Sequence, residues 1–176
     1  MSELDYKAAI EQCGFDCVGE CPASELHVRT EVRDMCAADR CQMYEKNWAC
    51  PPHCGTIEDF ASKFSQRTTC YVLQTVGELE DEFDVEGMLA AEELQGERMR
   101  KLAGLVADNA KAMVLDAGPC TLCPDCTCPD APCRFPDKRL VSMESSGLVV
   151  SDVCTSAGIP YNHGRGKMAY TGCLIV

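Results

Sequence analysis

The sequence predicts a single domain of the α/β or α+β class, in which a mixed sheet with flanking helices carries two cysteine-rich loops. Three observations predict this. The chain has 176 residues, and single domains commonly have about 100–200. Strand-like and helix-like segments alternate along the chain, without a regular repeat or a long linker. Nine of the fifteen cysteines lie in two short segments, 36–54 and 120–133.

The first element is expected to be a helix. Ser2 and Asp5 form a capping-box pattern, and Gly14 is a suitable end. Residues 26–32 alternate weakly and predict a strand. Residues 33–55 have no clear period, which predicts a loop with short helical pieces.

The middle of the chain carries the clearest elements. A helix is predicted to begin at Thr56, and Cys70–Val76 is rich in the β-branched and aromatic residues of strands. Asp84 is expected to cap a long helix that three glycines, at 87, 96 and 104, break or bend. The apolar side of this helix is predicted to comprise Val85, Met88, Leu89, Met99, Leu102, Leu105 and Val106. Ala112–Ala117 predicts a buried strand.

After the second cysteine segment, four short elements are expected. Asp137–Glu144 predicts a short helix and Leu148–Val150 a short strand. Ser151 is expected to cap a further helix that ends near Gly158. Met168–Val176 predicts the closing strand.

Charge and hydropathy exclude some functions. The net charge of −12 argues against nucleic acid, because phosphate binding needs clustered lysine and arginine. It suits docking onto a basic partner protein.

No apolar run approaches the roughly 18 residues of a membrane span, which argues against membrane insertion. The first ten residues also lack the basic and apolar parts of a signal peptide. We therefore expect a cytoplasmic protein.

The cysteine content predicts metal binding rather than disulfides. Fifteen cysteines are an odd number, and disulfide scaffolds are typically small secreted chains. In a reducing cytoplasm, clustered cysteines are more often metal ligands.

The second cysteine segment gives the more specific signal. Cys120, Cys123 and Cys126 are separated by two residues each, and Cys133 follows. Bacterial ferredoxins bind [4Fe–4S] clusters with C-x₂-C-x₂-C-x₃-C-P. Here the last gap is longer, and Cys128 is an extra thiol inside it. Zinc is the alternative, although zinc sites usually place two C-x₂-C pairs a dozen or more residues apart.

The first segment supplies a second set of candidate ligands, Cys36, Cys41 and Cys50. Cys54 is the nearest candidate for the fourth ligand. The alternatives are His53 or a ligand borrowed from the second segment, as in two-cluster ferredoxins. The helix expected to follow this segment would direct its positive N-terminal dipole at an anionic cluster. Two aromatic residues would shield a cluster or belong to the core: Tyr44 and Trp48.

Six further cysteines are predicted to be ordinary buried residues, because free cysteine is a common small apolar core residue. They are Cys13, Cys17, Cys21, Cys70, Cys154 and Cys173. The regular spacing of the first three leaves a further ligand set as the less favoured alternative.

Residues from about 30 to 176 resemble a family of predicted metal-binding proteins, a cysteine-rich domain of unknown function from anaerobic bacteria and archaea. The resemblance rests on Cys36, Cys41, Tyr44, Asn47-Trp48, Cys50-Pro51-Pro52, Gly118-Pro119-Cys120, Cys123, Cys126, Pro132-Cys133-Arg134, Pro136, Ser142-Met143-Glu144 and Gly147. It implies a metal and supplies no reaction.

Three functions fit these observations. The first is a small electron-transfer or redox-accessory protein with one or two [4Fe–4S] clusters, for which a basic redox partner protein would be suitable. One cluster would use Cys120, Cys123, Cys126 and Cys133, and the other Cys36, Cys41, Cys50 and Cys54. The second is an enzyme whose open-site cluster, held by three cysteines, binds a substrate or a metal complex. The third is a zinc-bound structural or interaction module.

Overall fold

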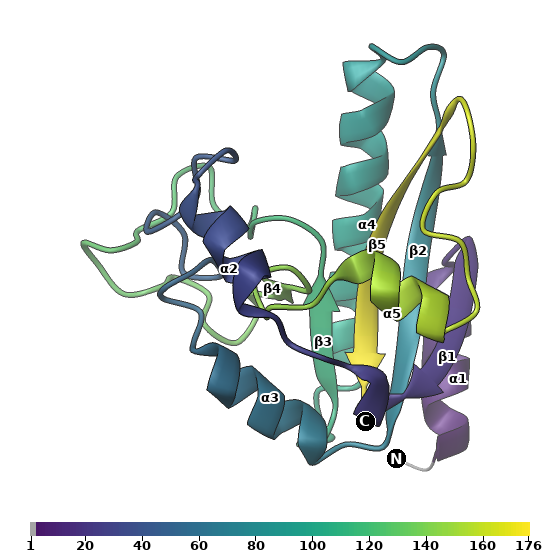
Figure 1. Cartoon of the computed structure of the whole chain (residues 1–176), viewed down its shortest axis with the longest axis horizontal. Helices are drawn as coiled ribbons and strands as arrows, with labels where there is room; N and C mark the ends of the chain where they lie inside the picture. Colours follow the sequence, from purple (N-terminus) through teal and green to yellow (C-terminus); the bar gives the residue numbers. More distant parts are fainter. Residues whose placement is uncertain (1–2) are drawn as a thin grey trace.

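The computed structural model describes residues 3–176 and is organised around one five-stranded sheet (Figure 1). The strands lie in the order β1-β2-β5-β3-β4. Neighbouring strands are antiparallel except β3 and β4, which are parallel, so the sheet is mixed. The strands are β1 Cys17–Pro22, β2 Thr69–Glu78, β3 Met113–Asp116, β4 Val141–Ser142 and β5 Lys167–Ile175.

Helices cover both faces of the sheet. They are α1 Glu3–Cys13, the 3-10 helix η1 Ala23–Glu25, α2 Thr30–Ala37, α3 Ile57–Ser65, α4 Val85–Leu105 and α5 Val150–Ser156. On β2, Tyr71 and Leu73 pack with α1 and α4, whereas Cys70 and Val72 pack with η1, α3 and α5. This alternation follows from the two-residue period of a strand. The result is an α+β fold with a mixed sheet between two helical layers, as predicted.

Several elements confirm the sequence-based expectations. Helix α1 ends before Gly14, although the capping role expected of Ser2 lies outside the described residues. Helix α3 begins with a reciprocal capping box in which Thr56 Oγ1 accepts from Asp59 N at 3.1 Å. Strands β2 and β5 form the longest ladder of the sheet, from Cys70 opposite Ile175 to Glu78 opposite Lys167.

Helix α4 corrects one expectation. Asp84 caps it, accepting from Gly87 N at 2.9 Å, but its three glycines neither break nor end it over 21 residues. Its buried side was also partly misassigned. Val85 and Leu89 are 61% and 58% exposed, while Gln95 is buried. Across the described residues, no helix is both long and apolar enough to cross a membrane.

Four other expectations were wrong. Residues 26–32 contribute one isolated bridge and the start of α2 rather than a strand. The helix expected over 137–144 is instead a turn followed by β4. Residues 148–150 lead into α5, whose N-cap is Val149 rather than Ser151. Strand β1 was missed because its alternation rests on glycine and cysteine, which have weak strand preference, and it forms by pairing with β2.

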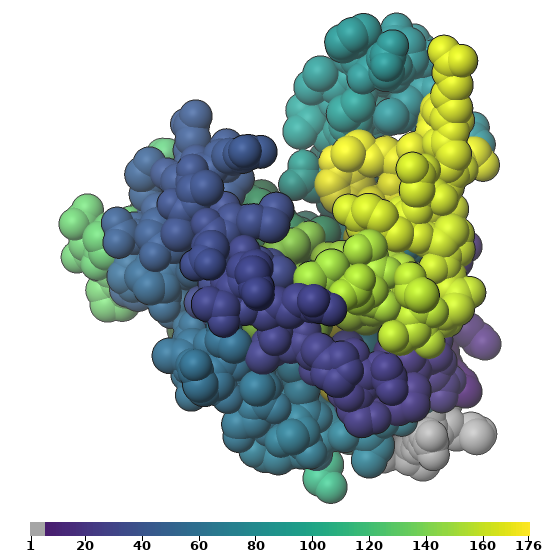
Figure 2. Space-filling view, viewed as in Figure 1, coloured from purple at the N-terminus to yellow at the C-terminus, as the bar shows by residue number. Residues whose placement is uncertain are grey.

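The two cysteine segments lie together beside the β3–β4 edge of the sheet. Figure 1 shows α2 and the loops after it on the same side as the loop that follows β3. The space-filling view in Figure 2 shows the two segments in contact on that flank. Residues more than 70 positions apart in the sequence therefore form one surface region of the fold.

Candidate metal centres

Hydrogen bonds connect the two cysteine loops. Asn47 Nδ2 donates to the carbonyl oxygen of Cys120 at 2.9 Å, and Trp48 Nε1 donates to that of Ala131 at 3.1 Å. Cys128 Sγ donates to the carbonyl oxygen of Glu45 at 3.4 Å. Asn47 is buried, so its amide fixes the position of the second loop against the first.

All four cysteines predicted from the second segment line one cavity, which we call the second cavity. They are Cys120, Cys123, Cys126 and Cys133. The first loop contributes Asn47, Trp48 and Ala49 to the lining. Burial raises the pKa of Cys120, and the neighbouring thiols of Cys133, Cys123 and Cys126 add to that increase. Four thiols in one cavity form a donor set suited to iron–sulfur clusters and to zinc.

The long gap between Cys126 and Cys133 is folded back on itself. Thr127 Oγ1 donates to the carbonyl oxygen of Pro132 at 2.9 Å, and Arg134 Nη1 donates to that of Asp125 at 2.8 Å. These bonds return Cys133 to the three cysteines that precede the gap. They explain how Cys133 joins the other three cysteines, although the gap before it is longer than in the ferredoxin pattern.

A larger cavity of about 160 Å³, which we call the first cavity, lies against the first loop. Three of its predicted cysteines line it, Cys36, Cys41 and Cys50. Burial raises the pKa of Cys50 to about 12, and the nearby thiols of Cys41, Cys54 and Cys36 contribute. Gly118 and Pro119, from the start of the second loop, also form part of this lining.

Neither of the two candidates for a fourth ligand, Cys54 and His53, belongs to the lining of the first cavity. Cys54 Sγ donates to the carbonyl oxygen of Ser145 at 3.7 Å. The His53 ring lies edge-on to Trp48, with centroids 5.1 Å apart. Each cavity is lined by cysteines of its own loop, with non-cysteine residues of the other loop completing the wall.

Glu144 lies in the first cavity, and residue spacing alone did not point to it. The residue forms part of the cavity lining, and its Oε2 is shielded from solvent without a hydrogen-bond partner among residues 3–176. Burial raises the pKa of this carboxyl, and hydrogen bonds from its own backbone N–H and from Ser142 offset part of the increase. The one sequence signal was its place in the Ser142-Met143-Glu144 motif of the family resemblance.

The backbone of the first loop adopts conformations that are rare for residues other than glycine. Asp39, Gln42 and Glu45 have φ angles of 52°, 59° and 61°. Asp39 Oδ1 accepts from the backbone N–H of Tyr44 at 2.9 Å, which holds this part of the loop. Left-handed residues of this kind cluster at binding and active sites. Here they lie between Cys36 and Cys50, on the chain that surrounds the first cavity.

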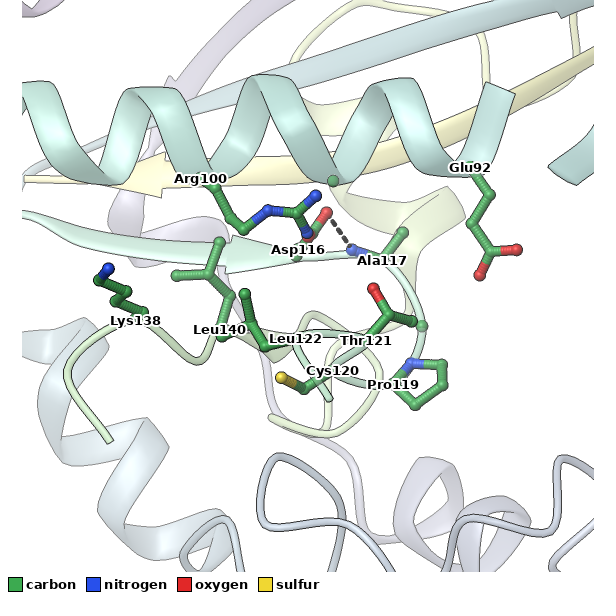
Figure 3. Close-up of a pocket in the computed structure, with 12 residues that line it drawn as sticks. Glu92, Arg100, Asp116, Ala117, Pro119, Cys120, Thr121, Leu122, Lys138 and Leu140 are labelled. Atoms are coloured by element: carbon green, nitrogen blue, oxygen red, sulfur yellow. Dashed lines mark hydrogen bonds between the residues drawn. The ribbon is translucent and has the colours of Figure 1, made fainter. Parts of the chain in front are cut away.

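A small polar pocket of about 30 Å³ lies between α4 and the start of the second loop. Figure 3 shows Arg100 extending from α4 towards Asp116, whose Oδ1 accepts from Ala117 N at 2.8 Å. Cys120 lines this pocket as well as the second cavity. Burial raises the pKa of Asp116 to about 6, although the Ala117 N–H and the Arg100 charge act in the opposite direction.

Asp116→Asn should therefore stabilise the protein at pH 8. The folded-state pKa of this carboxyl, about 6, exceeds its ordinary value of 3.8, so wild-type stability falls as the pH rises through that interval. We expect a gain of about 1–2 kcal/mol, since each pKa unit is worth about 1.4 kcal/mol and pocket water weakens the effect. The gain should shrink towards pH 5. Apparent Tm values of both proteins, measured without oxygen at the two pH values, test this; an unchanged gain at pH 5 would contradict it.

Five of the six remaining cysteines lie in the core, as predicted, whereas Cys17, at the start of the edge strand β1, is only half-buried. Cys70, Cys154 and Cys173 are fully buried, and they share one side of the sheet with Cys21, which pairs with Cys70 in the β1–β2 ladder. Cys13 is in the opposite layer, where its thiol donates to the carbonyl oxygen of Ala9 at 3.2 Å. Cys13, Cys17 and Cys21 therefore do not form one ligand set.

In the part of the chain that the structure describes, no three His, Cys, Asp or Glu side chains are grouped as ligands of a single metal ion. The candidate donors instead surround two cavities that lie next to each other. Their sulfur chemistry fits a thiolate-bound metal group.

Comparison with known proteins gave one match. The model of a family described as "Predicted metal-binding protein (DUF2284)" matches residues 20–176. No curated protein and no solved structure matches the chain. The matched range contains both cysteine loops and all five strands except the first three residues of β1.

Proposed function

Because the chain belongs to this family of predicted metal-binding proteins, we propose that it is an iron–sulfur protein with two [4Fe–4S] clusters. The observation that carries the proposal is the convergence of Cys120, Cys123, Cys126 and Cys133 on one cavity. Three of these cysteines follow the ferredoxin spacing, and ferredoxins hold [4Fe–4S] clusters with four thiolates. Cys133 completes the set through the folded-back gap.

The first cavity would hold the other cluster. Cys36, Cys41 and Cys50 line it, and Cys54 lies close by. Its volume of about 160 Å³ supports a group larger than one ion, since a cavity that holds a single water needs only about 10–15 Å³ by the same measure. Burial raises the pKa of Cys36 and Cys54, and the positive charge of Arg33 beside them offsets part of that increase. That charge would offset part of the negative charge of a thiolate-bound cluster.

Electron transfer is the role that this arrangement supports best. The first cavity includes Gly118 and Pro119, and the second includes Cys120, the next residue in the chain. Two clusters so placed would be neighbours, which suits electrons passing between them. We further propose that the protein acts in the cytoplasm with a basic redox partner, because its own net charge is −12.

A second candidate function is an enzyme with an open-site cluster in the first cavity. It is favoured by one observation: three cysteines line that cavity, while the Cys54 thiol is hydrogen-bonded to Ser145 outside the lining. A cluster held by three thiolates leaves one iron able to bind a substrate or a metal complex. The third candidate, a zinc module, has the same thiol donors.

The proposal is tested by a visible spectrum with iron, sulfide and zinc analysis of protein purified without oxygen. We expect a brown protein whose colour bleaches on reduction, with about eight iron atoms and eight sulfides per chain, because each cubane contributes four of each. About four iron atoms would limit the proposal to one cluster. A colourless protein with stoichiometric zinc, after attempted cluster reconstitution, would overturn it.

A further inference from the structure

We propose that the cluster in the first cavity is bound by three cysteines and one carboxylate, with Glu144 facing the fourth iron in place of a fourth thiolate. This inference rests on the proposed function and deepens it at that one site. It names a protein ligand that neither the cysteine spacing nor the family description supplies.

The position of Glu144 carries the proposal. It lies in the turn after β4 and forms part of the lining of the first cavity together with Cys36, Cys41 and Cys50. These four side chains come from α2, from the loop after it and from the end of the sheet. A [4Fe–4S] cubane takes four ligands from a protein, and this cavity has four candidate donors from separate segments.

The carboxylate also has a free acceptor. Ser142 and the Glu144 backbone N–H hydrogen-bond to the carboxylate, but Oε2 has no partner in the described chain and is closed off from solvent. A buried polar atom without a partner is costly and calls for an explanation, which a bound metal provides. The same atom belongs to a residue in the lining of the cavity where the metal group is expected.

Cys54 fits the fourth position less well. Its thiol is hydrogen-bonded to Ser145 O at 3.7 Å, and the residue is outside the cavity lining. In contrast, Ser145 itself and Ser142 belong to that lining, on either side of Glu144. The turn over 142–147 is held by Ser145 N donating to Ser142 Oγ at 3.0 Å and by Gly147 N donating to Glu144 O at 2.9 Å. The backbone of Glu144 is therefore fixed beside the cavity.

A carboxylate at the fourth iron would change its chemistry. Oxygen is a harder donor than sulfur and holds iron in a thiolate cluster less firmly. The fourth iron should therefore be the first lost on mild oxidation, leaving a three-iron cluster in the first cavity. The cluster in the second cavity, with four thiolates, should resist the same treatment.

The test compares Glu144→Gln with Cys54→Ser, both purified without oxygen alongside the wild type. Each is analysed for iron and sulfide and by electron paramagnetic resonance, first as purified and then after mild oxidation. The ligand assignment is judged on the proteins as purified, because mild oxidation is expected to remove the same iron from the wild type. We expect the Glu144→Gln chain to lose about one iron atom, to keep its sulfide and to give the signal of a three-iron cluster. Cys54→Ser should keep the wild-type iron content. Glu144→Cys should keep all its iron and become more resistant to oxidation than the wild type.

Iron loss from Cys54→Ser with none from Glu144→Gln would overturn the assignment of Glu144. So would an unchanged iron content in both variants. The second cluster serves as the internal reference for folding, because Cys120, Cys123, Cys126 and Cys133 are untouched in every variant. If the wild type itself contains no iron, the proposed function fails, and that result is distinct from either failure of Glu144.

Discussion

Cys133→Ser is expected to remove about half of the iron and half of the visible absorbance, because the cluster proposed for the second cavity is held by four thiolates and no other cysteine of the described chain lines that cavity to replace the lost one. Cys133 lies in the second cavity with Cys120, Cys123 and Cys126. The cluster proposed for the first cavity would use cysteines of the other loop and should remain. Iron and sulfide analysis of the variant, purified without oxygen, measures the loss.

Cys128→Ser is the matched control. Cys128 lies in the same loop, but its thiol is buried and donates to Glu45 O rather than lining the second cavity. Serine keeps that donor, so the variant should contain as much iron as the wild type. Equal iron losses from the two variants would contradict the ligand assignment, because they would indicate general damage to the loop. No loss from Cys133→Ser would contradict it more directly.

Gly172→Ala should be strongly destabilising. Gly172 lies in the central strand β5, and a Cβ there would be 2.6 Å from Leu115 O and 2.7 Å from Met99 Cε. Leu115 O belongs to the backbone of β3, the neighbouring strand, so it cannot move without disturbing the sheet. Met99 is fully buried in α4. We expect a loss of about 3 kcal/mol in the free energy of unfolding, at the upper end of ordinary overpacking.

The matched control for this substitution is Gly104→Ala. Gly104 lies near the end of α4, is exposed, and a Cβ there would have no heavy atom within 4 Å. Alanine is the better helix former, so this variant should be more stable by about 0.5–1 kcal/mol. Thermal unfolding of both variants and the wild type, without oxygen, gives the comparison. A similar Tm for the two variants would contradict the prediction, because it would show that the close approach of β5, β3 and α4 leaves room for a methyl group at residue 172.

Local sequence signals were enough where short-range physics decides the structure. The capping box at Thr56 and the capping role of Asp84 were predicted and are present. Strand β2 was predicted from its β-branched and aromatic residues, which pack against both helical layers. The failures were at β1 and near residues 137–150, where pairing and turn geometry outweigh local preference.

The sequence by itself determined the α+β class, the buried nature of Cys70, Cys154 and Cys173, and the two groups of candidate ligands. It did so because strand and helix periods, and C-x₂-C spacings, are local patterns. Only the tertiary structure decided which thiols share a cavity, that the two cavities are neighbours, and that Glu144 belongs to the lining of the first of them. Those facts depend on contacts such as Asn47 with Cys120, between residues far apart in the chain, and no local pattern encodes them.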